Sequence, residues 1–298
     1  MAAGGQSARI SSPESSPDNR VLPGTALALA AFAANSLFCR LALRPAAIDA
    51  ASFTFVRLLA GAIALGLICL IKRKPGRGLL RPDPVAVLAL FAYAAAFSFA
   101  YRDLTAGTGA LLLFGAVQAV MIGVGLFRGE RPGAAEWGGL VVALAGLGWL
   151  VAPGLAAPSP RGAGLMALAG AAWGVYSLRG RQAQDPLPAT AANFCWAVLP
   201  GLLVLGLAPG TLHVTAPGVQ WAVLSGALAS GVGYAVWYAV LPRLTAARAA
   251  TVQLTVPVLA AVGGVAFLDE EISPRLLLAA VLVLGGVALA VFSRKKAA

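Results

Sequence analysis

The sequence predicts an all-α integral membrane protein with ten transmembrane helices arranged as two inverted five-helix repeats. Three observations support this fold class. The 298 residues are 59% hydrophobic and only 11% charged, with a mean hydropathy of +0.84. Apolar runs of membrane-spanning length follow one another along the chain, and its two halves align at one constant offset. A soluble domain carries about 25% charged residues, so lipid must cover most of this protein's surface.

The elements follow in chain order. Residues 1–21, rich in Ser and Pro, are expected to form a disordered cytoplasmic tail. The first repeat is predicted over 22–152, a linker over 153–161 and the second repeat over 162–293, which leaves a basic cytoplasmic tail at 294–298. The apolar core of a bilayer takes about 20 residues of helix. The expected spans are 22–43, 49–71, 84–101, 104–126, 134–152, 162–179, 187–208, 218–240, 244–268 and 275–293.

Basic residues are distributed unequally between the two faces of the predicted bundle. Sixteen of the 22 Lys and Arg residues lie in the N-terminus, the even-numbered connections and the C-terminus. The opposite face carries five, and the remaining one, Arg57, lies inside a span. Cytoplasmic loops are enriched in Lys and Arg, so both termini are expected to be cytoplasmic. The same distribution accounts for the net charge of +11 without nucleic acid as a partner.

The two halves of the sequence align at an offset of 140 residues. Identical pairs at this offset include Thr105 with Thr245, Phe127 with Phe267, and Glu130 with Glu270. A repeat of five spans is odd, so the second copy is expected to enter the membrane from the opposite side. Inverted repeats allow one bundle to open toward either face around a substrate held near the midplane. The architecture therefore favours transport, with a small molecule and the lipid bilayer as partners.

Several motifs resemble a known family. They are Phe55-Val-Arg57-Leu-Leu-Ala-Gly61, Tyr101-Arg-Asp-Leu-Thr-Ala-Gly-Thr-Gly-Ala, Leu126-Phe-Arg-Gly-Glu130, and their second copies Leu241-Pro-Arg-Leu-Thr-Ala-Ala-Arg-Ala-Ala and Leu268-Asp-Glu-Glu271. Over residues 22–293 the chain resembles the EamA unit of the drug/metabolite transporter superfamily, and within it the YddG-type amino-acid exporters of bacterial inner membranes. The resemblance implies a multi-pass protein of the bacterial cytoplasmic membrane. The chain departs from the family pattern at Ala33-Ala34-Asn35, in place of a Trp-Gly-Ser type motif, and at Gln118, in place of a proline.

Arg57 is the sharpest candidate for a functional residue. It lies about eight residues into a predicted span, where an arginine costs roughly 2.5–3.5 kcal/mol on insertion scales. No carboxylate lies in the central part of any span to pair with it. Arg57 either faces a cavity and attracts a substrate carboxylate, or bonds carbonyls at helix ends. Alternatively, its side chain snorkels outward past Asp49 and Ser52.

Aromatic and amide side chains inside the spans supply further candidates. The expected substrate-binding aromatics are Tyr93, Phe97, Tyr101, Trp173, Tyr176, Tyr234, Trp237 and Tyr238. The intramembrane amides are Asn35, Gln118, Asn193 and Gln253, which can orient a substrate or hydrogen-bond a neighbouring helix. Aromatic stripes also serve as packing or as interfacial belts. Pro200 and Pro257 are expected to interrupt their spans and act as hinges.

The titratable residues argue against several other functions. All eleven acids lie in tails or near span ends, and Asp269-Glu270-Glu271 is expected to be a solvated helix end. A proton-driven carrier commonly uses an intramembrane Asp, Glu or His, so we expect facilitated export, or coupling by a less obvious route. The single histidine, His213, lies in a loop, and the three cysteines lack metal-ligand spacing. Neither a membrane-embedded enzyme, a metal site nor a cofactor is expected.

The function expected from the sequence is export of small metabolites, amino acids including aromatic or other apolar ones, by alternating access around a midplane cavity. A carrier for drugs or nucleotide sugars is the main alternative. A channel or scaffold subunit is a further one. The oligomeric state is left open.

Overall fold

The computed structural model describes the bundle and most of its connections. The described residues are 21–73, 82–127, 129, 133–154, 157–208, 212–244, 249 and 252–293. Regular secondary structure in these ranges is helical, apart from a single antiparallel bridge between Ile48 and Val214. The all-α class expected from the sequence is therefore confirmed for the described residues.

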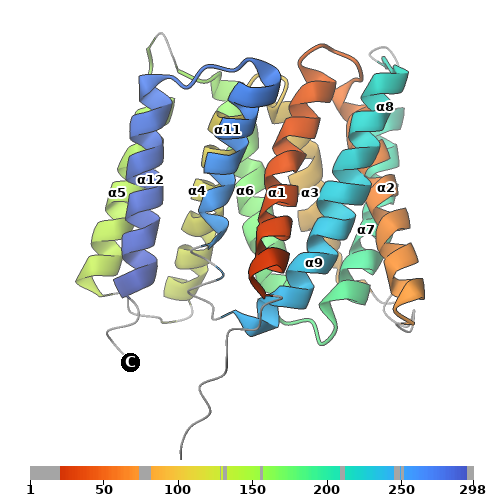
Figure 1. Ribbon diagram of the computed structural model, residues 1–298, viewed down its shortest axis with the longest axis horizontal. Helices are drawn as coiled ribbons and strands as arrows, with labels where there is room; N and C mark the ends of the chain where they lie inside the picture. Colours follow the sequence, from red (N-terminus) through yellow and green to blue (C-terminus); the bar gives the residue numbers. More distant parts are fainter. Residues whose placement is uncertain are drawn as a thin grey trace, which may run out of the picture.

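The helices run up and down as one layered bundle (Figure 1). Their bounds are α1 Val21–Leu43, α2 Ala50–Ile71, α3 Pro84–Ala100, α4 Ala106–Phe127, α5 Ala134–Val151, α6 Pro160–Gly180, α7 Pro186–Gly206, α8 Ala216–Val223, η3 Leu224–Val232, α9 Gly233–Val240, η4 Leu241–Arg243, α11 Thr255–Leu268 and α12 Pro274–Ser293. We call the end where α1 begins the terminal face, and the end where α1 stops the distal face. Because α1 to α5 are five helices, α6 starts at the distal face and runs opposite to α1.

Within the described ranges, seven helical segments are long and apolar enough to cross a membrane. They are Val21–Leu43, Ala50–Ile71, Ala106–Phe127, Ala134–Val151, Pro186–Gly206, Ala216–Arg243 and Pro274–Phe292. Two shorter apolar helices, α3 and α11, stand among them, and α6 falls outside both groups. A polytopic membrane protein is supported, whereas a count of ten crossings stays a prediction.

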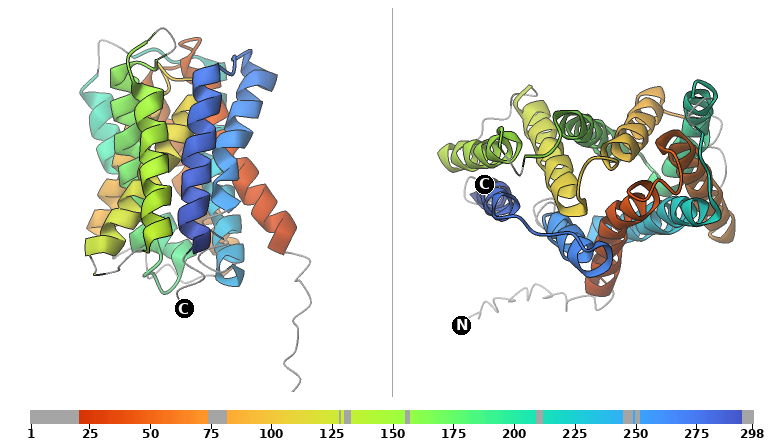
Figure 2. Two further views of the ribbon diagram at one scale, coloured as in Figure 1. Left: turned by 90° about the vertical axis from the view of Figure 1, so that its left-hand side faces the viewer. Right: turned by 90° about the horizontal axis from the view of Figure 1, so that it is seen from above.

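Helix contacts join the two halves of the chain more than they join neighbours in sequence. α5 packs against α12, α2 against α7, and α3 against α6, while α1 lies along α8, η3, α9 and α11. Figure 2 shows the α5–α12 pair standing at one end of the bundle. Glycines allow the close approaches, since a Cβ on Gly139 or Gly286 would collide with the backbone of the other helix of that pair.

α8, η3 and α9 form one continuous rod whose middle is a π-helix. The π-helical segment contains Ser225, Gly226 and Ser230, and Ser230 Oγ donates to the Ser225 carbonyl (2.9 Å). Gly226 abuts α2 so closely that a Cβ there would collide with the carbonyl of Arg57. π-Helical turns are frequent at functional sites, and this one lies beside the buried arginine.

The two prolines expected to interrupt their helices lie in different settings. α7 continues unbroken through Pro200. In the ninth span, expected over 244–268, residues 249, 252 and 253 are helical, Leu254 forms a turn, and α11 begins at Thr255. Pro257 therefore occupies the first turn of α11, where its missing N–H costs no helical hydrogen bond.

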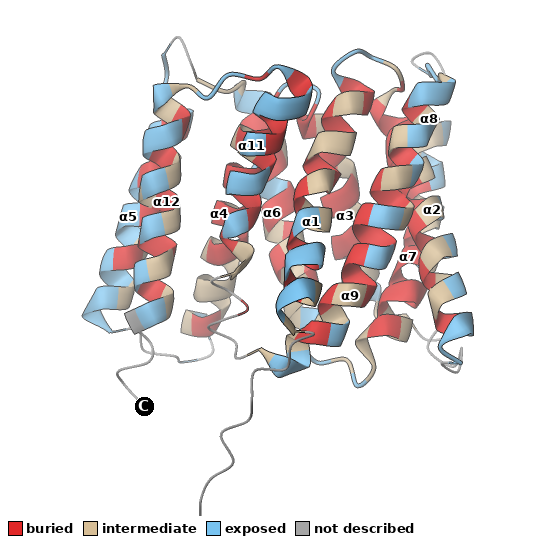
Figure 3. Ribbon diagram, viewed as in Figure 1, coloured by how far each residue is buried: buried red, intermediate tan, exposed pale blue. Residues whose placement is uncertain are grey.

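Burial follows the bundle rather than the usual pattern of a soluble protein. Buried residues face the interior, while the outer helix surfaces expose large apolar side chains (Figure 3). Examples are Leu67, Leu203, Val262 and Leu277, each more than half exposed. In water such a surface would be a large apolar patch, so lipid is the solvent that suits it.

Candidate functional site

A hydrogen-bonded group at mid-depth joins four helical segments. The Tyr93 hydroxyl on α3 accepts from Arg57 Nη2 on α2 (2.9 Å) and from Asn35 Nδ2 on α1 (3.1 Å). Ser225 Oγ, in the π-helix, donates to Asn35 Oδ1 (2.6 Å). All four residues are buried. We call Asn35, Arg57, Tyr93 and Ser225 the polar hub.

Arg57 lies inside the bundle and not at its surface. Only 1% of the residue is exposed, and the guanidinium carbon lies 5.0 Å from the ring centroid of Tyr93 and 4.8 Å from that of Phe97. Its Nε and Nη1 have no hydrogen-bond partner in the described part of the chain. The interpretation that Arg57 snorkels past Asp49 and Ser52 is therefore wrong, because aromatic rings and the Tyr93 hydroxyl hold its head in the interior.

A small cavity adjoins the polar hub. Its volume is about 60 Å³, room for a few water molecules but well below the roughly 300–1,000 Å³ of small-molecule sites. Side chains from both halves of the chain line it: Phe32, Asn35, Ser36, Tyr93, Phe97, Leu113, Phe114, Trp173, Ser177, Tyr234, Trp237, Tyr238 and Gln253. We call it the central cavity. In this conformation it is contracted around its own side chains.

Aromatic rings hold the two halves together around the central cavity. Trp173 of α6 lies between Tyr93 (centroids 5.0 Å apart) and Tyr234 of α9 (5.2 Å). Phe32 of α1 contacts both Tyr234 and Trp237 edge-on. Such pairs contribute about 0.5–1.5 kcal/mol each beyond their area burial. The walls are thus apolar ring faces with a few hydroxyls and amides.

A larger hollow of about 680 Å³ opens at the terminal face. The N-terminal end of α3, the facing ends of α6 and α7, and the 181–185 connection surround it, and Tyr176, Thr190 and Asn193 lie in its lining. Tyr176 Oη and Thr190 Oγ1 are 3.3 Å apart, and the Tyr176 ring lies 5.5 Å from Trp173. Trp173 lines the central cavity and Tyr176 lines the terminal hollow, so this ring pair lies where the two spaces approach each other.

An ion pair stands at the rim of the terminal hollow. Arg179 Nε donates to Asp83 Oδ2 (2.6 Å), and the other oxygen of Asp83 caps α3 by accepting from Val85 N and Ala86 N. The hydrogen bond from Arg179 lowers the pKa of the Asp83 carboxyl below its usual 3.8, followed by the cap hydrogen bonds. Both residues are partly exposed, so the pair contributes little stability and chiefly positions α3 against α6.

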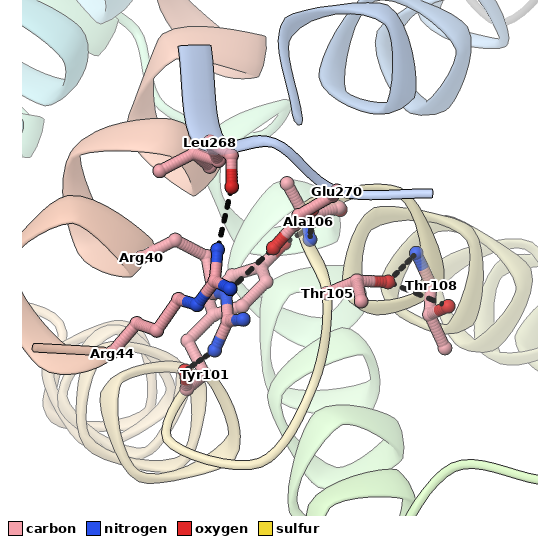
Figure 4. A network of polar contacts seen from close by, with 8 residues as sticks. All are labelled: Arg40, Arg44, Tyr101, Thr105, Ala106, Thr108, Leu268 and Glu270. Carbon is pink, nitrogen blue, oxygen red and sulfur yellow. Dashed lines mark hydrogen bonds and ion pairs between the residues drawn. The ribbon is translucent and has the colours of Figure 1, made fainter. Parts of the chain in front are cut away.

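The distal face is closed by buried polar contacts (Figure 4). Arg40 Nε, near the end of α1, donates to Glu270 Oε1 (2.9 Å), and Arg40 Nη1 donates to the Tyr101 carbonyl (3.0 Å). The second oxygen of Glu270 accepts from Ala106 N at the start of α4 (2.8 Å). We call Arg40, Tyr101, Ala106 and Glu270 the distal latch. It ties together the distal ends of four helices.

The connections at the distal face are also paired with one another. Thr215 N donates to the Ala47 carbonyl (2.9 Å), and Asp49 accepts from His213 N (3.1 Å). Partial burial raises the pKa of the Asp49 carboxyl, but hydrogen bonds from Ser52, His213 and Ala51 outweigh it and the net pKa lies below its usual value. The 44–49 and 212–215 connections are therefore fastened across the end of the bundle.

The structure separates the expected substrate-binding residues by location. Asn35, Tyr93, Phe97, Trp173, Tyr234, Trp237 and Tyr238 line the central cavity. Tyr176 and Asn193 line the terminal hollow, and Arg57 contacts the cavity wall through Tyr93. Tyr101 lies in the distal latch, and Gln118 faces a small space between α4, α5 and α12. Neither of these two lines the central cavity.

Sequence reasoning missed several participants. Glu270 was expected at a solvated helix end, but it is only 9% exposed and pairs with Arg40. Asp269 makes this possible, because its left-handed backbone (φ 50°, ψ 39°) turns the chain back so that Glu270 points into the bundle. The alignment of Glu270 with Glu130 at the 140-residue offset is a sequence signal that could have singled out Glu270. No comparable sequence pattern pointed to Phe32 or Ser225.

Comparisons with known proteins agree with the geometry. A sequence model of the EamA-like transporter family matches residues 22–152 and again 160–292. An uncharacterized protein of Pseudomonas aeruginosa is 52% identical over 276 residues, which cover 92% of this chain and 95% of that protein. A solved crystal structure superimposes with a TM-score of 0.66, covering 95% of this chain and 99% of its own, at 21% identity. That last likeness concerns the fold alone.

Proposed function

The chain belongs to the EamA-like transporter family, and from this premise we propose that it exports amino acids, including aromatic or other apolar ones, by alternating access. Membership makes the protein a membrane transporter of small solutes and not an enzyme. The finer proposal rests on one observation: the two halves of the chain build a shared, mostly aromatic cavity at mid-depth. Ring faces suit apolar side chains, and the polar hub beside them suits the charged end of an amino acid.

Alternating access is supported by the asymmetry between the two faces. The distal face is fastened by the latch and by paired connections, whereas the terminal face carries a hollow of about 680 Å³. The Trp173–Tyr176 ring pair connects the lining of that hollow with the lining of the central cavity. In this scheme, rotation of Trp173 and Tyr176 admits substrate from the terminal side, and release of the distal latch lets it leave.

The terminal face is proposed to be cytoplasmic, in a bacterial inner membrane. The argument is the sixteen-to-five distribution of Lys and Arg between the faces. Single cysteines in a background without Cys39, Cys69 and Cys195 test it. Ala183→Cys in the terminal hollow should react with an impermeant thiol reagent only from the cytoplasmic side, and Val214→Cys only from outside. The reverse pattern overturns the orientation.

The composition of the cavity disfavours the rival cargoes. A nucleotide sugar carries several phosphate charges and needs clustered cations, yet the described lining contains no Lys or Arg and Arg57 is the single guanidinium behind it. The positive charge of Arg57 also opposes a cationic drug. A channel is disfavoured as well, because the central cavity is contracted to a volume of about 60 Å³.

Facilitated export is proposed, since neither Asp, Glu nor His lines the central cavity in the described part of the chain. Counterflow of labelled phenylalanine into proteoliposomes tests both the cargo and the coupling. We expect saturable exchange without an imposed pH gradient. Trp237→Ala, in the cavity wall, should reduce exchange at least tenfold, and Trp137→Ala, on the exposed side of α5, should leave it unchanged. Absence of saturable flux for every amino acid overturns the proposal.

A further inference from the structure

We propose that Arg57 is the binding group for a carboxylate on the transported solute, and that this carboxylate, not the amino group, is the charge that the transporter requires. The inference rests on the proposed export function and specifies its substrate class as apolar monocarboxylates, amino acids among them. Its basis is the unmet hydrogen bonding of a buried cation, and each step follows from the polar hub and the lining of the central cavity.

The first step concerns charge. A guanidinium stays protonated in proteins, so a full positive charge lies within the bundle at a residue that is 1% exposed. Within the described residues, the partners of Arg57 are neutral: one tyrosine hydroxyl and two ring faces. Glu270, the buried acid of the described residues, is already paired with Arg40 and the α4 terminus. A buried charge without a counterion is costly, and an incoming anion removes that cost.

The second step concerns hydrogen-bond geometry. Nη2 donates one of its two N–H groups to Tyr93, while Nε and Nη1 lack partners within the described ranges. A guanidinium binds a carboxylate through two parallel N–H groups. Both edges able to do this include Nη2, paired either with Nε or with Nη1. Each edge uses a different N–H of Nη2, so the Tyr93 hydroxyl occupies one edge and leaves the other free. A carboxylate can bind the free edge beside Tyr93 or replace the hydroxyl on the occupied edge.

The third step concerns access. Tyr93 and Phe97 line the central cavity, and their rings also contact the Arg57 guanidinium, which does not itself belong to the lining. Their rings are the wall between the arginine and the solute. Widening the cavity from about 60 Å³ to the size of an amino acid requires these rings to move, and movement of Tyr93 uncovers Arg57. Binding of the carboxylate and expansion of the cavity thus become one event.

The fourth step concerns the amino group. No Asp or Glu lines the central cavity among the described residues, so an ammonium group meets ring faces, hydroxyls and amides. Cation–π contact stabilises an ammonium by about 0.5–2 kcal/mol, less than a bidentate ionic bond contributes. The asymmetry predicts that removing the carboxylate harms binding much more than removing the amine.

A competition assay on the wild-type protein tests the inference. Labelled phenylalanine counterflow is measured against unlabelled phenylalanine, 3-phenylpropionate, phenylalaninamide and phenethylamine. The first two carry a carboxylate, and the last two do not. We expect 3-phenylpropionate to compete within about threefold of phenylalanine, and both amines to compete at least tenfold more weakly. Equal competition by phenylalaninamide overturns the role of Arg57 while leaving amino-acid export intact.

Binding measured without transport separates this inference from the proposed function. The four compounds are also titrated against detergent-purified protein, with the intrinsic fluorescence of the cavity tryptophans and the thermal midpoint as readouts. Carboxylate-selective binding without any flux would support Arg57 and end the export proposal. Binding of none of the four compounds overturns the inference for this substrate class.

Variants at Arg57 distinguish ligand binding from a purely structural role. Arg57→Gln keeps a hydrogen-bond donor for Tyr93 but removes the charge, so it should abolish the preference for acids over amides. Arg57→Lys should retain part of that preference. A structural role instead predicts equal loss for acids and amides with the ratio unchanged. Should a variant fail to fold, the wild-type competition panel still decides.

Discussion

Glu270 at the distal end of α11 lies 2.9 Å from the Nε of Arg40 near the end of α1, and the pair is more than nine-tenths buried. It joins residues 230 positions apart in the chain and fastens the face opposite the terminal hollow. Removing one partner of a buried pair leaves an uncompensated charge and costs about 3–5 kcal/mol. In a carrier that must open on this side, the same contact sets the energy of the open state.

We therefore expect Glu270→Gln to lower the free energy of unfolding by about 3 kcal/mol and to make the distal end of the cavity reactive to an impermeant thiol reagent through Ser36→Cys. Asp269→Asn is the matched control, because Asn tolerates the left-handed backbone and Asp269 is exposed. Chemical denaturation in detergent and cysteine labelling measure the two effects. Unaltered labelling in Glu270→Gln contradicts the role of the latch as a gate.

If the inference above is correct, the Tyr93 hydroxyl competes with a substrate carboxylate for one of the two guanidinium edges of Arg57. Tyr93→Phe removes two accepted hydrogen bonds, from Arg57 and from Asn35. The empty protein should lose about 1–3 kcal/mol of stability. Its affinity for 3-phenylpropionate should rise several-fold, because both edges of the guanidinium are then free of a competing hydroxyl.

A fall in the stability of the empty protein together with a rise in affinity for the acid is the expected result for Tyr93→Phe. Thermal midpoints with and without 3-phenylpropionate measure both. Tyr238→Phe serves as the control, since Tyr238 also lines the cavity, whereas the rings that contact the Arg57 guanidinium are those of Tyr93 and Phe97. A fall in affinity for the acid in Tyr93→Phe would mean that Tyr93 holds the substrate itself.

Much of the fold followed from the sequence because membrane helices are encoded locally. About 20 apolar residues between turn signals specify a span, whatever the rest of the chain does. Arg57 stood out for the same reason, since a charge inside an apolar run is costly wherever its partners lie. The aromatic residues at 93, 97, 173, 234 and 237 could be nominated from their mid-span positions, and the structure brings them to one cavity.

The predictions that were wrong or missing concern contacts between segments that are distant in the sequence. The rotation of α4 that turns Gln118 toward α5 and α12 depends on helix packing, and no local pattern reports it. The burial of Glu270 depends on the backbone turn at Asp269 and on the position of Arg40. The π-helix that brings Ser225 to Asn35 is a local distortion of an apolar run with no sequence signature of its own.

The terminal rim should respond to acid in one direction only. The pKa of Asp83 in the folded protein is depressed, chiefly by Arg179. The contribution of the pair to stability is therefore fully present above the pKa of Asp in the unfolded chain, about 4. It is lost as the pH falls through the pKa of Asp83 in the folded protein. Asp83→Asn removes the charge and keeps a residue suited to cap α3. The difference in thermal midpoint between wild type and Asp83→Asn should be constant from pH 5 to 8 and should shrink below about pH 4. A difference that varies between pH 5 and 8 contradicts this assignment.

The crossing of α2 and η3 next to Arg57 depends on a missing side chain. A Cβ on Gly226 would collide with the carbonyl of Arg57 and approach Ala60, whereas a Cβ on Gly66 of the same α2 helix meets nothing within 4 Å. Gly226→Ala should therefore cost about 1–3 kcal/mol through overpacking. The added methyl group should push α2 away from η3 and move Arg57 away from Tyr93. Phenylalanine exchange should therefore weaken as well. Gly66→Ala removes glycine from a helix interior and should be neutral or stabilising by up to about 1 kcal/mol. Chemical denaturation and counterflow on both variants make the comparison, and equal stability of the two alanine variants contradicts a close-packed α2–η3 contact as the element that positions Arg57.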